Sequence, residues 1–261
     1  MEFLLEGKRV FAGTGGRGFA AALPTSVLLH GAGLDHTIWA LQARALAHHG
    51  RNVLALDLPG HGRSEGPPRA RIDAMAEWVL AVLAARGVTR FRLAGHSMGA
   101  LVAFAAAARA GDRVESLALL GFAPEMRVHP ALLAAARDGA HAAVEFMVSW
   151  GLGAASQLGG NPAPGLWLTG AALRLLERAP AASLAADLAA CDGYNAGAEA
   201  TVPACPTLLL LGADDRMTPP EAAIAFARRL PQARITVLPG VGHLMPIEAP
   251  GATLAALKSA L

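Results

Sequence analysis

Residues 95–99 read Gly-His-Ser-Met-Gly, and this Gly-x-Ser-x-Gly pattern constrains the fold more than any other feature of the chain. It stands between a short apolar stretch, 91–95, which is typical of a buried strand, and an alanine-rich stretch, 98–110, which favours a helix. A sharp turn from strand to helix lifts a serine hydroxyl clear of the backbone, where a base can reach it. The residues two positions before and after the serine must then be very small, and both are glycine. The pattern predicts that Ser97 is a nucleophile.

Short apolar stretches alternate with stretches of helical length along most of the chain, after an N-terminal hairpin that we expect within residues 3–19. The strands are expected at 26–30, 53–57, 91–95, 116–121, 207–212 and 234–238, and the helices at 37–50, 73–86, 98–110, 219–230 and from about 250. This alternation indicates crossover connections. We therefore predict an α/β fold with a mainly parallel sheet and helices on both of its faces.

Residues 122–202 depart from this alternation, because they contain no convincing strand. The helical stretches of this segment are expected at 130–150, 167–179 and 181–191. The whole chain has 261 residues, of which 54% are hydrophobic. This length and composition suit one domain with a single large hydrophobic core. We predict a core domain formed by residues 1–121 and 203–261, with residues 122–202 inserted between two of its strands as a helical cap.

A base for the serine is expected in the glycine-rich segment after the last predicted strand. His243 lies in that segment, at the end of the sheet where the ligand sites of parallel sheets gather. An imidazole suits both the removal of the serine proton and its return to a leaving group. A carboxylate should hold the imidazole in one tautomer and should follow a strand between the serine and the histidine. Asp214 and Asp215 are the two candidates.

A tetrahedral intermediate needs two hydrogen-bond donors on its oxyanion. We expect one from the backbone amide of Met98, directly after the serine, and the other from the amide of Ala32, in the segment His30-Gly31-Ala32-Gly33. The alternative for this segment is a tight turn without a catalytic part. Residues 57–64, Asp-Leu-Pro-Gly-His-Gly-Arg-Ser, are dense in turn formers, and we interpret them as a structural loop in which Asp57 accepts backbone hydrogen bonds.

Charge and cysteine content exclude several classes of function. The 22 basic residues are scattered among 20 acidic ones, with a formal charge of +2 and no basic stripe, so nucleic-acid binding has no electrostatic footprint. Cys191 and Cys205 stand in no metal-ligand spacing, and free thiols are the simpler interpretation. We expect neither a metal ion nor an organic cofactor.

The sequence predicts no secretory signal and no membrane span. Residues 1–9 lack the apolar core of a signal peptide. The longest uncharged stretch, 146–173, is interrupted by glycines and by Pro162 and Pro164, so it cannot form a continuous membrane helix. We therefore expect a cytoplasmic protein without stable membrane insertion. Its expected partner is a small-molecule ester substrate, and a homodimer is the one protein assembly that we consider.

With these motifs in place, the chain resembles the α/β-hydrolase superfamily along nearly its whole length, and in particular serine esterases and lipase-like members with a helical cap. The resemblance rests on residues 30–33, 57–64, 95–99, 212–215 with Pro219, and 242–243. It implies an eight-stranded, mainly parallel sheet. It also implies an acid three residues beyond Gly212, which selects Asp215, and a helical cap where residues 122–202 lie.

The motifs and the resemblance together predict a serine hydrolase that cleaves carboxylic esters of small to medium size through an acyl-enzyme intermediate. Four residues are candidates for substrate contact, namely Trp150, Phe122, Phe146 and Leu244. The alternative for the aromatic ones is that they only pack the cap onto the core. The same scaffold hosts other chemistries. Alternatives are therefore a carbon–carbon bond hydrolase or a cofactor-free lyase with the same triad, or a non-catalytic ligand-binding member of the fold.

Overall fold

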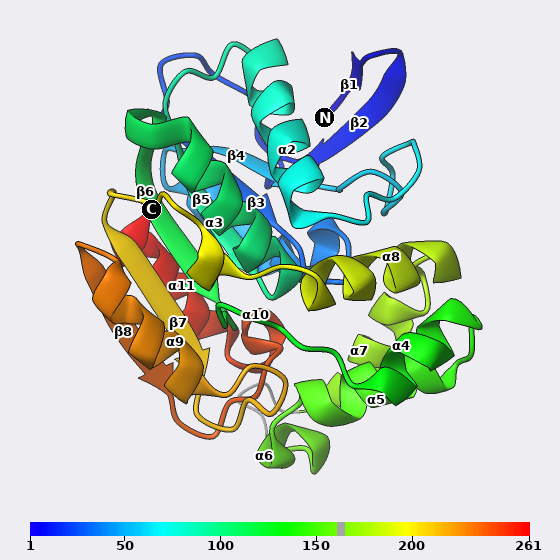
Figure 1. Cartoon of the computed structure of the whole chain (residues 1–261). Coiled ribbons are helices and arrows are strands. Elements are labelled where there is room, and N and C mark those ends of the chain that lie inside the picture. The colour runs from blue at the N-terminus through cyan, green and yellow to red at the C-terminus, as the bar shows by residue number, and fades with distance from the viewer. Residues whose placement is uncertain (161–164) are drawn as a thin grey trace.

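The buried apolar stretches form an eight-stranded sheet in the computed structural model, which describes residues 1–160 and 165–261 (Figure 1). The strand order is β1-β2-β4-β3-β5-β6-β7-β8. Strand β2 runs antiparallel to both of its neighbours, and all other neighbouring strands are parallel. The strands are β1 (Glu2–Leu5), β2 (Lys8–Gly13), β3 (Thr25–Leu29), β4 (Asn52–Leu56), β5 (Phe91–His96), β6 (Val114–Leu120), β7 (Thr207–Gly212) and β8 (Ala233–Leu238). The predicted fold class is confirmed.

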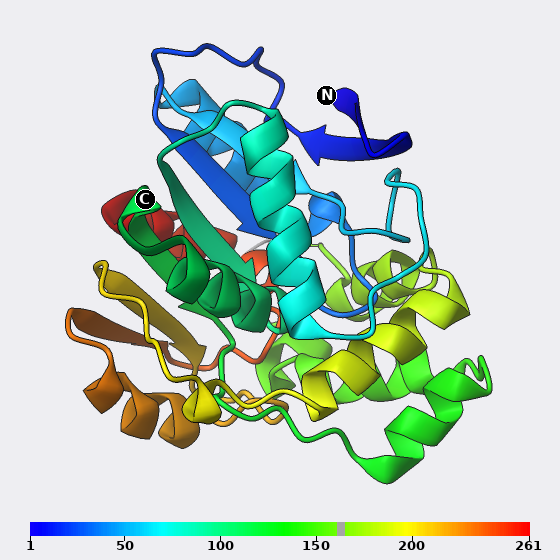
Figure 2. The ribbon, with the colours of Figure 1, turned by 45° about the horizontal axis from the view of Figure 1, so that its top comes forward.

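Helices cover both faces of this sheet, which explains why β3, β4 and β7 are buried at every position. Figure 2 shows α2 and α3 in front of the strands, with α1 and α11 behind them. The core helices are α1 (Ala40–His48), α2 (Ile72–Ala85), α3 (Met98–Ala110), α9 (Pro220–Phe226), α10 (Met245–Glu248) and α11 (Pro250–Ala260). No helix in the described part of the chain is both long and apolar enough to cross a membrane.

The N-terminal hairpin expected within residues 3–19 is present but shorter, since its strands span Glu2–Leu5 and Lys8–Gly13. It turns at Glu6 and Gly7, which both have positive φ, as a two-residue hairpin loop requires. One other local expectation needs correction. The single helix expected at 130–150 is two helices, because Gly139 takes a φ of +65° after the first of them and ends it.

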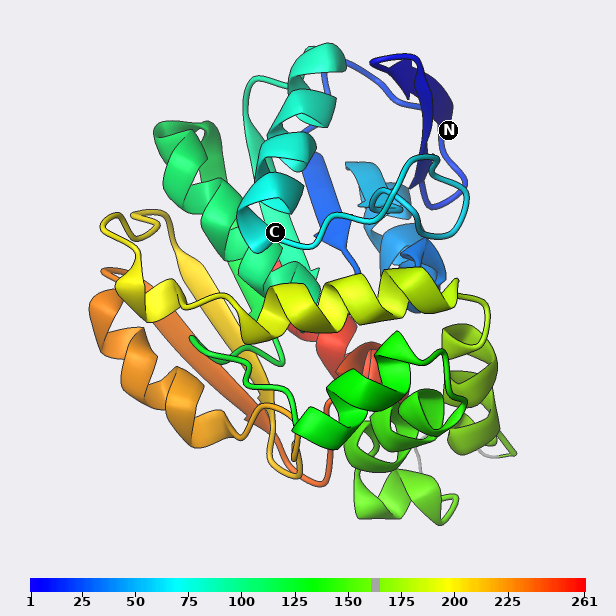
Figure 3. The ribbon, with the colours of Figure 1, turned by 45° about the vertical axis from the view of Figure 1, so that its right-hand side comes forward.

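The helices between β6 and β7 in sequence lie over the carboxyl edge of the sheet, where the cap is predicted, and we refer to them as the cap (Figure 1). Its described helices are α4 (Pro130–Arg137), α5 (Ala142–Gly151), α6 (Ala154–Gln157), α7 (Leu168–Leu176) and α8 (Ala181–Asp192). Figure 3 shows α8 between the core and the other cap helices. Pro162 and Pro164, which interrupt the long uncharged stretch, lie outside the described residues. The limits of the core and cap domains stay a prediction.

Phe122 belongs to the core and not to a substrate pocket, contrary to the expectation from the sequence. It directly follows the end of β6, is fully buried, and lies in a cluster with Phe104 of α3 and Phe226 of α9. The ring centroids in this cluster are 5.6 to 6.0 Å apart. These three rings pack helices from two parts of the chain against the end of β6.

Phe122→Ala should lower the free energy of unfolding by about 3 kcal/mol or more, because it leaves a cavity among fully buried rings. Phe146→Ala is the matched control. That side chain is 37% exposed, so its loss should cost less than about 1 kcal/mol. Urea unfolding of both variants measures the two values. Equal losses would contradict the assignment of Phe122 to the core.

Candidate active site

Ser97 occupies a strained turn between β5 and α3. Its φ and ψ are 55° and −122°, and Glu6 is the only other described residue besides glycine with a positive φ. Such a conformation costs about 1–3 kcal/mol and persists where the surroundings impose it. The Ser97 amide donates to the carbonyl of Leu120 at 2.8 Å, and its carbonyl accepts from the amide of Ala100 at 2.7 Å. The backbone on both sides therefore holds the serine in this turn.

The glycines of the pentapeptide are required by close backbone contacts. A Cβ atom on Gly95 would lie 2.0 Å from the carbonyl oxygen of Gly99, and one on Gly99 would lie 2.3 Å from that of Leu29. A Cβ atom on Gly31 would lie 3.1 Å from the Cβ of Ser97. The segment after β3 thus passes directly beside the serine.

Asp215 and His243 come together at the ends of β7 and β8. Oδ2 of Asp215 lies 2.7 Å from Nδ1 of His243, and both side chains are buried. The amides of Met217 and Thr218 donate to Oδ1 of Asp215 at 2.9 and 2.8 Å. Asp214, the other candidate acid, is exposed. The geometry therefore agrees with the choice of Asp215.

The hydrogen bonds of Asp215 determine which nitrogen of His243 carries the proton. A carboxylate only accepts hydrogen bonds, so Nδ1 donates, and in the neutral form of the ring Nε2 then carries the lone pair. Nε2 is buried and has no hydrogen-bond partner among the described residues. Ser97 and His243 line the same cavity, although no hydrogen bond joins their side chains in the described part of the chain. Catalytic hydrogen bonds are often long before substrate binds.

Two opposing effects act on the carboxyl group of Asp215. Burial alone would raise its pKa, but the charge and hydrogen bond of His243, together with the hydrogen bonds from Thr218, outweigh burial and lower the pKa below its usual value. Asp215 is therefore ionised at neutral pH, which is the state that steadies an imidazolium ion.

The loop that carries His243 is held by contacts that sequence reasoning missed. Nε2 of His96 lies 2.8 Å from the carbonyl oxygen of His243. The carbonyl of Gly151, at the end of α5, accepts from the amides of His243 and Leu244 at 2.7 and 3.2 Å. A Cβ atom on Gly121 would lie 3.0 Å from the His243 ring, so this glycine leaves room for the imidazole.

Glu248 is a second buried acid at this loop. One of its oxygens accepts from the amides of Gly153 and Gly242 at 2.8 and 3.2 Å, and the other accepts from the amide of Leu244 at 3.0 Å. It therefore joins the cap to the histidine loop. The only trace of this role in the sequence is an acid five residues after the histidine, in an otherwise apolar stretch.

The segment His30-Gly31-Ala32-Gly33 forms a turn in which the amide of Leu34 donates to the carbonyl of Gly31 at 3.2 Å. Ala32 lines the cavity together with Ser97. Met98 is the first residue of α3, so its amide is one of the unpaired donors at the helix N-terminus. The two proposed oxyanion donors thus come from adjacent strand ends.

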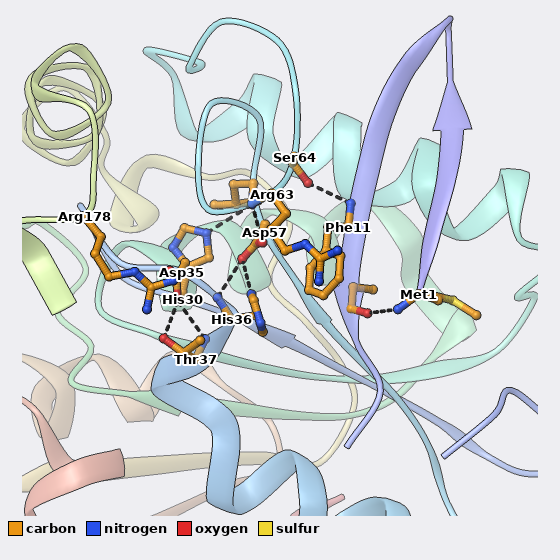
Figure 4. Close-up of polar contacts among 12 residues, drawn as sticks. Met1, Phe11, His30, Asp35, His36, Thr37, Asp57, Arg63, Ser64 and Arg178 are labelled. Carbon is orange, nitrogen blue, oxygen red and sulfur yellow. Dashed lines mark hydrogen bonds and ion pairs between the residues drawn. The ribbon is translucent and has the colours of Figure 1, made fainter. Parts of the chain in front are cut away.

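Residues 57–64 form the structural loop that the sequence predicts (Figure 4). Oδ1 of Asp57 accepts from the amide of His36 at 2.7 Å, and Oδ2 accepts from the amide of Arg63 at 2.9 Å. Asp35, His36 and Asp57 are close enough together to hold a cation. However, Asp57 also lies 2.8 Å from Nδ1 of His36, and Asp35 pairs with Arg178 of the cap at 3.0 Å. Because protein groups already satisfy these oxygens, we assign no metal to them.

A cavity of about 390 Å³ opens between the cap and Ser97, and its size suits a small-molecule ligand. Trp150 and Phe146 line it, as expected from the sequence. Leu244 lines a smaller space beside Ser97 and His243. The remaining lining residues are Ala32, Met126, Arg127, Val128, His129, Pro130, Leu132, Met147, Leu188, Cys191, Arg216, Met217 and Thr218.

Comparison with known proteins identifies the family. Residues 27–257 match the Alpha/beta hydrolase family, and the chain belongs to it. The chain is 32% identical over 231 residues to a pimeloyl-[acyl-carrier protein] methyl ester esterase of Chromobacterium violaceum, covering 84% of this chain and 87% of that protein. The enol-lactonase of Burkholderia xenovorans has a similar structure, with a TM-score of 0.87, 26% identity and coverage of 99% of this chain and 98% of that one.

A third relative is longer. The dihydrolipoyllysine-residue acetyltransferase component of the acetoin cleaving system of Pseudomonas putida is 34% identical over 237 residues, which cover 85% of this chain. The match covers only 59% of that protein. The matched family is nevertheless one of hydrolases, and the two proteins compared above are an esterase and an enol-lactonase.

Two buried histidines near the site are neutral. Burial and then the charge of His61 lower the pKa of His30 to about 4, and burial and then His243 lower that of His96 to about 3. In the unfolded chain both pKa values return to about 6.5, so the unfolded state binds more protons than the folded state between these values. Stability must therefore fall as the pH decreases below about 6.5.

We expect the free energy of unfolding to fall by about 1.4 kcal/mol per pH unit for each of these histidines between pH 6 and 4.5. His96→Gln should remove about half of the combined slope of the two histidines, since glutamine does not titrate. His61, whose pKa is raised, acts in the opposite direction and at higher pH, so it does not obscure this range. Urea unfolding at a series of pH values measures the slope. An unchanged slope in the variant would contradict a neutral, buried His96.

Proposed function

We propose that the chain is a serine esterase for carboxylic esters of small to medium size. The observation that carries this proposal is the buried pair of Asp215 and His243, because His243 lines the same cavity as Ser97 and its Nε2 has no hydrogen-bond partner among the described residues. An imidazole poised as a base beside a serine in a strained strand-to-helix turn is the arrangement that acyl transfer needs. The names of two relatives, a methyl ester esterase and an enol-lactonase, are consistent with an ester or lactone substrate.

The proposed reaction has two stages. Oγ of Ser97 attacks the ester carbonyl while Nε2 of His243 takes its proton, and Asp215 stabilises the resulting imidazolium. The amides of Ala32 and Met98 hold the oxyanion, and its collapse expels the alcohol with the proton from His243. Water, activated by the same nitrogen, then attacks the acyl-enzyme and releases the acid. Every catalytic group in this proposed reaction belongs to the chain, and only the ester and the water come from outside it.

A chain-length series of p-nitrophenyl esters tests the reaction class. We expect hydrolysis that is strongest for short to medium acyl chains, because the cavity is limited in volume. Ser97→Ala should lower kcat by about 10⁴-fold or more, since the members of a triad act as a unit. Retained turnover in that variant would reject Ser97 as the nucleophile.

The alternatives predict a different pattern in the same experiment. A carbon–carbon hydrolase or a cofactor-free lyase would react with a fluorophosphonate at Ser97 and yet leave the whole ester series unchanged. A non-catalytic ligand-binding protein would neither react with the fluorophosphonate nor hydrolyse the esters at a useful rate. Labelling and turnover together therefore separate the three classes.

The charge of the cavity suggests what else the substrate carries. Arg127 and Arg216 line the cavity, and no described aspartate or glutamate does. Arg127 pairs with Glu125 at 3.4 Å, whereas Arg216 donates to the carbonyl of Ser149 and forms no ion pair with a described residue. We propose that Arg216 favours esters whose far end bears a carboxylate.

Monomethyl adipate and methyl hexanoate are a matched pair of substrates, since they differ only in a terminal carboxylate. Arg216→Gln should raise KM about tenfold for the charged ester, because it removes a charge-assisted hydrogen bond of about 1.5 kcal/mol. KM for the neutral ester should not change. Arg174→Gln, on an exposed cap residue that does not line the cavity, is the control. Equal effects of Arg216→Gln on both esters would contradict the proposal.

A further inference from the structure

Another buried acid, Asp187, joins the cap to residues 30–33, the segment that contains the proposed oxyanion donor Ala32. Asp187, on α8, is fully buried, although the groups that its side chain contacts belong to the core. Its Oδ2 accepts from the amide of Gly33 at 2.9 Å and lies 2.8 Å from Nε2 of His61. Its Oδ1 has no hydrogen-bond partner among the described residues. Burial of a carboxylate costs free energy unless it is paired, so the position of Asp187 depends on these two contacts.

The contact with Gly33 acts on the turn that contains Ala32. Gly33 is the third residue of this turn and has a φ of +66°, which a type II turn requires at that position. The amide that Asp187 accepts belongs to the central peptide, between Ala32 and Gly33. A type I turn differs from a type II turn by the rotation of this peptide. Asp187 therefore selects one of the two turn conformations next to the proposed oxyanion donor.

The contact with His61 supplies the opposite charge. Nδ1 of His61 lies 3.1 Å from the carbonyl oxygen of Pro59, and Nε2 faces the Asp187 carboxylate. Because both partners only accept, both ring nitrogens carry protons and the ring is positively charged. Burial lowers the pKa of His61, but the hydrogen bond and charge of Asp187 outweigh it and raise the pKa above its usual value. His30, whose ring lies 4.9 Å away, accepts from the amide of Leu58 and stays neutral.

We infer that Asp187 is a positioning residue through which the docked cap sets the oxyanion turn. This inference rests on the proposed function, since it concerns the hydrolytic site. The carboxylate does not touch the reacting atoms. It holds the peptide that follows Ala32, and the imidazole of His61 is its second partner in this buried place. Closure of the cap and completion of the oxyanion site are then one event.

A neighbouring residue of the same helix provides a matched control. Ser183, one turn before Asp187, is also buried and donates from Oγ to the carbonyl of Gly60 at 2.8 Å. It ties α8 to the core without reaching the turn that contains Ala32. Ser183→Ala therefore loosens the cap by one hydrogen bond but leaves the contact with Gly33 in place.

The test compares Asp187→Ala, Asp187→Asn and Ser183→Ala. Removal of an oxyanion donor typically costs about 10²–10³ in kcat, and we expect Asp187→Ala to lower kcat about 10- to 100-fold with KM within about twofold. Asp187→Asn, which can still accept from the amide of Gly33, should recover part of this loss. Ser183→Ala should keep kcat within about twofold. Thermal unfolding of each variant reports whether it is folded at the assay temperature.

Two further measurements isolate the oxyanion. A trifluoromethyl ketone, which forms an oxyanion on reaction with serine, should lose affinity for Asp187→Ala in parallel with kcat. The matching methyl ketone should bind the variant and the wild type equally. The rate at which a fluorophosphonate labels Ser97 should also fall in Asp187→Ala and not in Ser183→Ala, and this readout needs no substrate.

The outcomes separate the inference from the proposed function. If the wild type is labelled but hydrolyses no ester, the substrate class is wrong and the labelling rates still test Asp187. The positioning role is overturned if Asp187→Ala and Ser183→Ala lower kcat and the labelling rate by the same factor. It is also overturned if Asp187→Asn is labelled as slowly as Asp187→Ala, although the asparagine can accept from the amide of Gly33. Absence of labelling in the folded wild type would overturn both proposals.

Discussion

The candidate site depends on backbone contacts that only glycine permits. At Gly95 and Gly99 the chain passes so close to neighbouring carbonyl groups that a single added carbon atom would overlap them. These contacts impose the positive φ of Ser97 and bring the segment after β3 beside it. Because β3, β5, β7 and β8 are parallel, their loops open at the same edge of the sheet. Ser97, Asp215 and His243 thus lie at one edge of the sheet, although His243 comes 146 positions after Ser97 in the sequence.

Three of the buried carboxylates, Asp215, Glu248 and Asp187, organise the loops around Ser97 and His243, and each is stabilised in a different way. Asp215 faces the imidazole of His243, Glu248 accepts three backbone amides, and Asp187 combines an amide with the imidazole of His61. Each charge is compensated locally, as burial requires. Two of the three acids, Glu248 and Asp187, bridge the cap and the core. The electrostatic balance of the site is therefore shared between the two parts of the chain.

The sequence predicts those features whose chemistry demands one residue type at one spacing. The strand-to-helix turn at Ser97, the buried strands and the histidine after the last strand are of this kind, and so is Asp57, which the structure shows accepting the expected backbone hydrogen bonds. The roles of Asp187 and Phe122 could not be predicted, because each depends on partners far away in sequence. Gly33, for example, lies 154 residues from Asp187. The ends of the cap helices are also hard to predict from the sequence, because alanine-rich stretches lack clear signals for the start and end of a helix.

The carbonyl of Gly151 accepts from two successive amides of the histidine loop, so this attachment of the cap uses main-chain atoms alone. Any residue with the same backbone path and no clash could make it. Mutation can therefore change the side chains of α4, α5 and α7 while the cap stays attached to the loop that carries His243. A scaffold of this kind can change the lining of its cavity during evolution without changing the backbone around the candidate site, which is a physical basis for the diversity of chemistry found on one fold.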